Sequence, residues 1–515
     1  MKKRLFPFLT LLVVLTVLIS ACSQKLEYTN VIPRDANVVM TIRMKSLAEK
    51  AGFNDETNET ARQKLKDMLK SGLSASGFQQ IEKIVEEPEK AGIDVNVPIY
   101  LFSSPALPYI ALVSKVSNKN DLQTLLETLE KEKLCSPIEK ADNYEYTEIG
   151  KQALLAFNSS ALLCVAYNNI SQSENIKQAI VPLFKQDVKN SICSTPIFEK
   201  LQKSKGDISL FFSSTSIPET YRKLTGSVLP RSNSQNDLSI LSNLSFENGK
   251  IRMECEYLTQ NAETQKAIEK YSNAMRPINN TFLAYFPQST LVVFSMGING
   301  EKLYDALQGN EEFQSLFSNP QSSNIKNIFN ALQGDLTIGL TGISPYGSPE
   351  FLAYANIKNK SAIEQLYERK SELGLNAGED IIKLGNDEYA FKSPEINFFF
   401  GFRNDALYIT NNKQLYQTNK MEAPSALNTE YAPEIKGKRA VLIINMESVL
   451  NIPFVKVMVA YGGPEYTAYH SLANKIAYIK TSIDSQNIEM TLQLKNKDIN
   501  ALKQIVDFIK EFAGI

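Results

Sequence analysis

The chain has 515 residues, a formal net charge of −1, five cysteines, one histidine and no tryptophan. A single hydrophobic core stops growing at about 250–300 residues, so this length predicts at least two domains. Because 55 basic side chains balance 56 acidic ones, the composition lacks the basic surface that nucleic-acid binding needs, and we expect no nucleic-acid partner.

The N-terminus has the parts of a secretory signal peptide. The basic segment Met1–Arg4 is followed by an apolar run of about 15 residues, which is shorter than the roughly 20 residues that cross a membrane. The run ends in the small residues Ser20 and Ala21, which suit cleavage by a peptidase. We therefore predict that residues 1–21 form a signal peptide.

The last residues of this segment, Ile19-Ser20-Ala21-Cys22, resemble the lipobox of bacterial lipoproteins. The resemblance implies cleavage between Ala21 and Cys22, a diacylglyceryl group on the Cys22 sulfur, and a further acyl chain, such as palmitate, on its amine. Two or more chains anchor a protein stably to a membrane. No aspartate follows Cys22 and no acidic cluster comes after it, so we expect the periplasmic face of the outer membrane. The alternative is an ordinary secretory signal.

The mature chain contains an internal repeat, which is best sought before any single element is interpreted. Five motifs recur in the same order and with similar spacing: Pro33–Thr41 and Pro287–Ser295, Val116–Leu122 and Ile357–Ile363, Phe157–Leu163 and Phe402–Tyr408, Ile217–Pro218 and Ile452–Pro453, Phe246–Glu254 and Ile483–Thr491. We predict two homologous tandem domains, residues 22–277 and 278–515.

The same elements are expected in both domains. In the first domain the patterns predict strands at Val38–Met44 and Tyr109–Val116, a helix at Asp121–Lys131, a hairpin of Leu154–Phe157 with Ala161–Tyr167, and a strand at Ile208–Ser213. In the second they predict strands at Val292–Ile298 and Phe351–Ile357, a helix at Ser361–Leu373, a hairpin of Asn397–Phe402 with Ala406–Thr410, and a strand at Ala440–Asn445. Each domain should close with a hairpin and a helix. Hairpins mixed with helices favour an α+β fold, in which a largely antiparallel sheet packs with helices.

One segment differs in polarity between the two domains. Phe454–Ala460 is more apolar than Tyr221–Val228, which stands at the corresponding place in the first domain. We expect a better-buried core helix at Phe454–Ala460, and the alternative is an exposed helix that contacts a partner or lipid.

Four cysteines remain after the lipobox: Cys135, Cys164, Cys193 and Cys255. An even number of cysteines in an exported protein allows two disulfides. The repeat aligns Cys164 near Ile409 and Cys255 with Leu492, which instead favours small buried thiols. Both interpretations stay open.

Catalytic and metal-binding patterns are scarce. Serine and cysteine nucleophiles usually need a histidine base, and His470, the single histidine, is expected to be structural or on the surface. Ser323–Lys326 fits Ser-x-x-Lys but lacks the companion motifs of penicillin-recognising enzymes, so we interpret it as coincidence. Zinc, EF-hand, Walker and dinucleotide motifs do not occur. We assign no catalytic residue, metal ligand or cofactor.

The lipobox, the segment Tyr28–Val39 and the segment Met44–Gly52 together resemble a family of uncharacterised Bacteroidetes lipoproteins, classed as domain of unknown function 4836. The likeness covers the mature chain. It implies an envelope location and a duplicated α+β architecture, and it brings no activity.

We therefore expect a non-enzymatic, lipid-anchored envelope protein that acts as a scaffold or as a binding module. Its partner would be a protein or a small ligand held in the cleft between the two domains, where ligand sites are common. The alternatives are a hydrolase that uses carboxylates or a metal, and a glycan-binding lipoprotein that uses tyrosine and phenylalanine.

Overall fold

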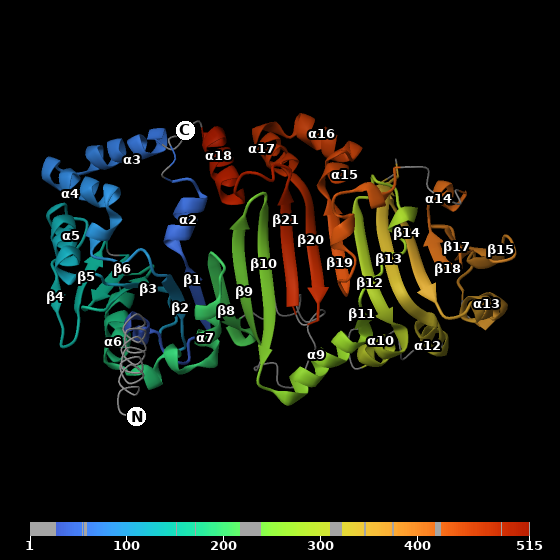
Figure 1. Ribbon diagram of the computed structural model, residues 1–515, viewed down its shortest axis with the longest axis horizontal. Coiled ribbons are helices and arrows are strands. Elements are labelled where there is room, and N and C mark those ends of the chain that lie inside the picture. Colours follow the sequence, from blue (N-terminus) through green and yellow to red (C-terminus); the bar gives the residue numbers. More distant parts are fainter. Residues whose placement is uncertain are drawn as a thin grey trace, which may run out of the picture. The chain divides into compact units, whose positions relative to one another are not determined.

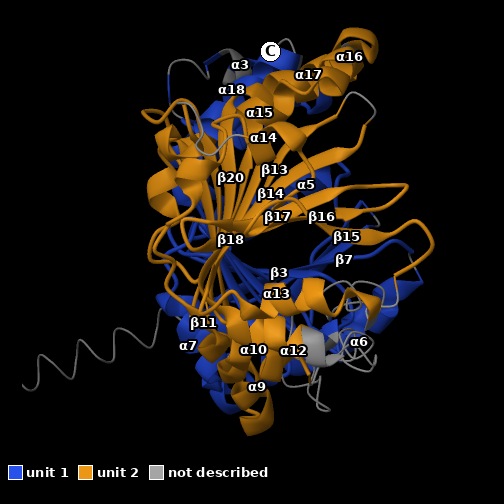
Figure 2. Cartoon of the chain, turned by 90° about the vertical axis from the view of Figure 1, so that its right-hand side faces the viewer, with its two compact units in different colours: residues 1–216, 240–245, 502–515 blue, residues 217–239, 246–501 orange. Residues whose placement is uncertain are grey.

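The computed structural model describes residues 27–53, 55, 59–150, 152–169, 171–216, 238–308, 322–344, 347–372, 375–417, 424–485 and 487–513. The predicted signal peptide, the lipidation site Cys22 and the Ile217–Pro218 motif lie outside these described residues. The chain forms two compact units, which Figure 2 colours separately. Unit 1 comprises residues 1–216, 240–245 and 502–515, and unit 2 comprises residues 217–239 and 246–501.

Unit 1 contains an antiparallel sheet in the order β8-β1-β2-β3-β7-β6-β5-β4. Its strands are β1 (Val38–Ile42), β2 (Ile99–Ser103), β3 (Ala111–Lys115), β4 (Glu139–Lys140), β5 (Glu145–Ile149), β6 (Ala153–Phe157), β7 (Ala161–Ala166) and β8 (Ile208–Ser213). Its α-helices are α2 (Met44–Lys50), α3 (Glu59–Gly72), α4 (Ala75–Glu86), α5 (Lys119–Lys131), α6 (Gln172–Lys185) and α7 (Pro196–Lys203). Short 3-10 turns are η1 (Glu27–Val31), η3 (Pro88–Ala91), η4 (Val188–Asn190), η5 (Ile192–Ser194) and η6 (Ser214–Ser216).

Unit 2 contains an antiparallel sheet in the order β10-β21-β20-β19-β12-β13-β14-β18-β17-β16-β15, with β11 also on β12. Its strands are β10 (Lys250–Thr259), β11 (Met275–Arg276), β12 (Val292–Asn299), β13 (Leu332–Ile343), β14 (Pro349–Ile357), β15 (Asp380–Lys383), β16 (Glu388–Lys392), β17 (Phe398–Arg403), β18 (Ala406–Thr410), β19 (Ala440–Asn445), β20 (Ile476–Asp484) and β21 (Asn487–Leu494). Strand β9 (Leu238–Glu247) contains residues of both units.

The helices of unit 2 are labelled in Figure 1. They are α9 (Ala262–Ala274), α10 (Gly300–Leu307), α12 (Ser322–Ala331), α13 (Ser361–Glu368), α14 (Lys413–Gln417), α15 (Met446–Leu450), α16 (Pro453–Tyr461) and α17 (Gly463–Asn474), with 3-10 turns η8 (Leu283–Tyr285), η9 (Lys370–Glu372), η10 (Ala426–Asn428) and η11 (Ala432–Glu434). The last helix, α18 (Ala501–Ala513), belongs to unit 1 from Leu502 onward. The α+β prediction, with largely antiparallel sheets, is confirmed.

The order of strand pairing occurs twice. The run β8-β1-β2-β3-β7-β6-β5-β4 matches the run β19-β12-β13-β14-β18-β17-β16-β15 strand for strand. Smaller features repeat as well, since Pro33 bridges Ser191 in unit 1 and Pro287 bridges Ser425 in unit 2. The elements that the sequence motifs predict therefore take the same place in both runs.

Strand β10 belongs to unit 2 because it pairs with β21 over seven residues, from Lys250 to Glu256. In that pair Met253 lies opposite Met490. The compact units therefore differ from the two predicted domains, which meet after residue 277. That boundary describes the sequence repeats and stays a prediction.

Each sheet is covered by helices that bury one apolar face. In unit 1, Asn118 caps α5 by accepting hydrogen bonds from the N–H groups of Asn120 and Asp121, and Leu122 and Leu126, one turn apart, reach the core beside Phe157. In unit 2 a larger cluster contains six buried aromatic side chains: Phe282, Phe286, Tyr354, Tyr408, Tyr431 and Tyr478.

The prediction of a buried helix at Phe454–Ala460 is wrong. Helix α16 forms there but has no buried residue, and the side chains of Phe454 and Tyr461 are 69% and 87% exposed. Apolar composition indicates that a helix face is buried against something, but the same composition fits burial in the protein's own core and burial against a partner.

The four remaining cysteines are thiols rather than disulfides, and each is half-buried. Burial raises the pKa of the Cys164 and Cys135 thiols. The sequence allowed either two disulfides or four thiols, and the structure has four thiols. Within the described ranges no helix is long and apolar enough to cross a membrane.

Candidate functional site

The main cavity of unit 2, with a volume of about 1020 Å³, lies at the ends of two neighbouring strands of the sheet, β12 and β19. β12 begins at Val292, opposite Leu340, while its neighbour β13 continues to Ile343. β19 ends at Asn445, opposite Tyr478, while its other neighbour β20 extends two residues further, to Ile476. Two longer strands therefore flank the space that the two shorter strands leave.

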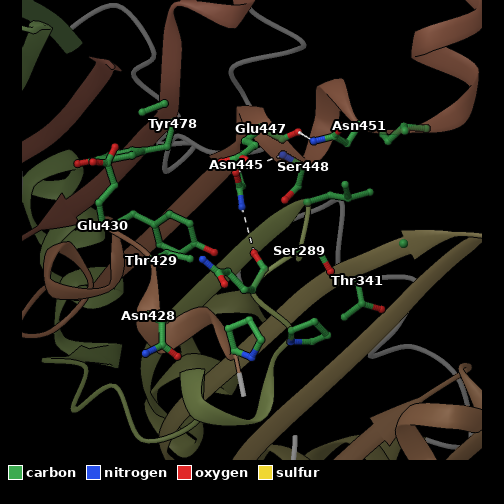
Figure 3. Close-up of a pocket in the computed structure, with 18 of the residues that line it drawn as sticks. Ser289, Thr341, Asn428, Thr429, Glu430, Asn445, Glu447, Ser448, Asn451 and Tyr478 are labelled. Atoms are coloured by element: carbon green, nitrogen blue, oxygen red, sulfur yellow. Dashed lines mark hydrogen bonds between the residues drawn. The ribbon is translucent and has the colours of Figure 1, made fainter. Parts of the chain in front are cut away.

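The wall that follows β19 is set by a helix cap. The Asn445 side chain accepts a hydrogen bond from the Ser448 N–H (3.4 Å) and donates one to the Gln288 carbonyl (3.3 Å), so it starts α15 and ties it to the segment before β12. This cap places Glu447 and Ser448, in the first turn of α15, at the cavity (Figure 3).

The opposite wall is a tight turn, η10, which begins with a reciprocal cap. Ser425 and Asn428 hydrogen-bond each other's backbone and side chain at this turn, and Ser425 forms an isolated bridge with Pro287. The Thr429 hydroxyl then donates to the Ala426 carbonyl (2.7 Å). Asn428, Thr429 and Glu430 lie across the cavity from Thr341 in Figure 3 as a result.

Two buried tyrosines form the inner part of the cavity. Tyr431 and Tyr478 are 2% and 5% exposed, and their rings meet edge to face at 6.0 Å. Burial raises the pKa of both phenols, so both stay protonated hydrogen-bond donors at neutral pH. The Tyr431 hydroxyl lies beside the side chains of Thr429 and Asn445, which donate their own hydrogen bonds elsewhere, to the Ala426 and Gln288 carbonyls. The Tyr431 hydroxyl itself forms no hydrogen bond of ordinary distance and angle with the described residues.

The charges around the cavity are few and unequal. Glu430 pairs with Lys497 (2.7 Å), and the Lys495 ammonium donates to the Asn474 side chain (3.1 Å). Glu447 is exposed at the cavity and forms no ion pair within the described part of the chain. The lining therefore presents one carboxylate that is available to a ligand.

The full lining mixes hydroxyl, amide and apolar groups: Pro287, Gln288, Ser289, Leu291, Thr341, Gly342, Ile343, Pro424, Asn428, Thr429, Glu430, Tyr431, Asn445, Glu447, Ser448, Asn451, Ile452, Pro453, Ala477, Tyr478 and Lys495. Such a surface can hydrogen-bond a polar molecule from several sides. Its two aromatic side chains are too deeply buried to offer a ring face for stacking.

The residues that the sequence analysis weighed for chemistry lie elsewhere. His470 is half-buried on α17 and does not line the cavity. Ser323 is on α12, where the Lys326 ammonium lies 5.8 Å from the centre of the Tyr304 ring. Among the residues that the structure describes, no group of three or more His, Cys, Asp or Glu side chains could hold a metal ion.

A second charged site in unit 2 has a structural explanation. The Lys480 side chain is 4% exposed, and its ammonium pairs with Glu434 (2.6 Å) and with Glu489 (2.8 Å). Lys480 lines a cavity of about 220 Å³. Arg252 lines the same cavity and pairs with Glu254. These charges satisfy one another across β10, β20 and β21, and they tie η11 to the sheet.

The sequence did not reveal the residues of the main cavity, because caps and strand ends create it rather than a motif. Two repeat motifs are the signals that fall on it: the first five residues of Pro287–Ser295 come just before β12, and both residues of Ile452–Pro453 line the cavity. The predicted cleft between the two domains stays a prediction, since the cavity described here lies within unit 2.

Comparison with known proteins gives a family but no activity. A family model described as "Domain of unknown function (DUF4836)" matches residues 28–502. None of the curated proteins compared with the chain matches it. Two crystal forms of TP0453, forms III and IV, are similar at 14% and 13% identity over 48% and 44% of this chain and 86% and 79% of theirs. Both have a TM-score of 0.25, which is too low to indicate a shared fold.

Proposed function

We propose that this chain, which belongs to the DUF4836 family of domains of unknown function, is a lipid-anchored envelope protein that binds a small polar ligand in the cavity of unit 2. The observation that carries the binding role is the buried Tyr431 hydroxyl. A buried polar group without a partner costs about 1–3 kcal/mol, and a ligand that accepts its hydrogen bond recovers that cost.

The chemistry of the lining selects the ligand. One available carboxylate, Glu447, favours a neutral or positively charged molecule over an anion. The amides of Asn428 and Asn451 and the hydroxyls of Ser289 and Ser448 suit hydroxyl, amide and ammonium groups. Amino sugars and the amino-terminal ends of short peptides share these groups, and both are small enough for a cavity of this volume.

The ligand test compares these two sources. The chain from Ser23 to Ile515 is titrated with glucosamine oligomers and, separately, with short peptides that have free amino termini, and its thermal unfolding is followed. A ligand at 100 times its dissociation constant stabilises the folded protein by about 2.7 kcal/mol. We expect one series to raise the melting temperature, and acetylation of its amine to weaken the effect. If neither series stabilises the protein, the binding role is wrong.

A hydrolase is the alternative that this assay also covers. Turnover of the stabilising molecule, lost in Glu447→Gln, would replace the binding role by a catalytic one. Unchanged ligand after long incubation supports binding alone.

The lipid anchor rests on the sequence of the lipobox and on its likeness to Bacteroidetes lipoproteins. We infer cleavage after Ala21, diacylglyceryl and acyl modification of Cys22, and a place at the periplasmic face of the outer membrane. Labelling of cells with a palmitate analogue should mark the wild-type protein and leave Cys22→Ser unmarked. Equal labelling of both would remove the anchor from this proposal.

The repeated strand order supports a further part of the proposal, a gene duplication. Two runs of eight strands with the same pairing, together with five sequence motifs in the same order, fit two homologous copies of one ancestral domain. On this proposal the cavity developed in the second copy, where Asn445 stands at the position that Ser213 occupies in the first.

A further inference from the structure

Helices α16 and α17 expose a set of large apolar side chains, here called the α16–α17 surface. Its members are Phe454 (69% exposed), Val457 (54%), Met458 (37%), Tyr461 (87%), Tyr466 (43%), Tyr469 (70%) and Leu472 (37%). Single exposed apolar residues are ordinary in soluble proteins, whereas a connected group marks a site of interaction.

The members of this surface are connected. Phe454, Val457 and Tyr461 follow one another at helical spacing along α16, and Tyr466, Tyr469 and Leu472 do so along α17. Gly462 joins the two helices, and a Cβ there would lie 2.5 Å from the Tyr466 ring. The ring therefore packs on the turn itself, and both helices are seen side by side in Figures 1 and 2.

The area of this surface is that of a stable interface. A large side chain buries on the order of 200 Å² when fully covered, so the exposed fractions of the seven residues give roughly 700–800 Å². A standard protein interface buries about 800 Å² on each partner.

The composition favours a protein partner over a lipid surface. Helices that lie on membranes have a strongly charged face that is rich in lysine and arginine. Here the two helices carry one lysine, Lys456, and one glutamate, Glu465, and neither forms an ion pair within the described ranges. Enrichment in tyrosine, phenylalanine and methionine with few charges is typical of the centre of a protein interface.

We propose that the α16–α17 surface is a homodimer interface, in which two copies of this chain meet around a two-fold axis. A surface with one positive and one negative charge does not repel a copy of itself. A two-fold arrangement also lets Lys456 of one copy meet Glu465 of the other, which supplies both charges with partners.

The test measures self-association of the chain from Ser23 to Ile515 by sedimentation velocity across about 1–100 µM, a range in which dimers of moderate affinity dissociate. The variant is Phe454→Asp with Tyr461→Asp, whose wild-type side chains are mostly exposed, so folding should persist and is checked by circular dichroism. The matched control is Leu384→Asp, because Leu384 is 43% exposed between β15 and β16 of the same unit.

We expect the wild type and Leu384→Asp to form dimers, and the double variant to dissociate at least tenfold more readily. A wild type that stays monomeric at the highest concentration overturns the proposal, and so does a dimer that the double variant leaves unchanged. Flotation of the wild type with neutral phosphatidylcholine vesicles, lost in the double variant, would assign the surface to lipid and equally overturn it.

Discussion

Met253 of β10 and Met490 of β21 lie directly opposite each other in an antiparallel pair, and they occupy the same position in the two copies of the last repeat motif. Two residues on, Cys255 lies opposite Ile488, and two residues back, Ile251 lies opposite Leu492. In the repeat alignment Ile251 corresponds to Ile488, and Cys255 corresponds to Leu492. Exchanging each residue for its counterpart therefore turns the pair Ile251–Leu492 into the pair Ile488–Cys255, which is the pattern expected if a two-fold axis relates the two motifs.

This register predicts a specific crosslink. Directly opposite residues in antiparallel strands have Cα atoms about 4.5–5.5 Å apart, within the range that a disulfide spans. Met253→Cys with Met490→Cys should therefore form a disulfide under mild oxidation, and peptide mapping by mass spectrometry identifies it beside the four native thiols.

The matched control shifts one partner along the strand. Met253→Cys with Leu492→Cys places the two residues diagonally, roughly 7–8 Å apart. Leu492 lies opposite Ile251, so the new thiol does not face the native Cys255. It should crosslink poorly. Equal yields for both pairs would contradict the register, and with it the proposed two-fold relation between the repeat motifs.

A second prediction concerns the buried ammonium of Lys480. Lys480→Met leaves Glu434 and Glu489 without their shared partner. Loss of one partner from a fully buried pair costs about 3–5 kcal/mol, and we expect about 2–3 kcal/mol here because Glu434 is 42% exposed. The urea midpoint of unfolding measures the loss.

The control for that variant is Lys497→Met. Lys497 pairs with Glu430, but both side chains are about half exposed, so the loss should stay below about 1 kcal/mol. Similar losses for the two variants would show that burial of Lys480 adds nothing.

The same ion pair predicts a dependence of stability on pH. Burial alone would raise the pKa of Glu489, but the hydrogen bond and charge of Lys480 outweigh it and hold that pKa below the ordinary 4.5. A carboxyl with a lowered pKa stabilises the fold above its unfolded pKa and loses this effect as the pH falls through its folded pKa. Stability should therefore decline below about pH 4.5 by this contribution.

Urea midpoints measured from pH 7 to about pH 3 test the effect. Glu489→Gln should start less stable at pH 7 and then lose less than the wild type on acidification. Glu395→Gln, at an exposed position between β16 and β17, serves as control and should follow the wild type. A Glu489→Gln curve parallel to the wild type would contradict the assignment.

Much of the fold could be predicted from the sequence because the repeat doubled each signal. The predicted strand at Ile208–Ser213 is β8 and the one at Ala440–Asn445 is β19, with the same bounds. β13 (Leu332–Ile343) was missed, because Gly334, Gly339 and Gly342 interrupt its apolar pattern and glycine is depleted in strands.

The site was harder to predict for a physical reason. Its walls come from the cap residues Asn445 and Ser425 and from the relative lengths of β12, β13, β19 and β20, and pairing in three dimensions sets those lengths. The exposure of α16 was missed for a similar reason. The sequence pattern of an apolar helix is the same whether the helix packs in the protein's own core or against a partner.

The binding of the stabilising amine-bearing probe to the wild type and to Tyr431→Phe, by calorimetry, tests the central claim most directly. The Tyr431 hydroxyl forms no hydrogen bond of ordinary distance and angle with the described residues, so its removal should leave the free energy of unfolding unchanged or higher. The affinity for the probe should fall about five- to 150-fold, because only the wild-type complex recovers the roughly 1–3 kcal/mol cost of the unpaired hydroxyl. Equal affinity of the two proteins would contradict the claim that this cavity is the binding site.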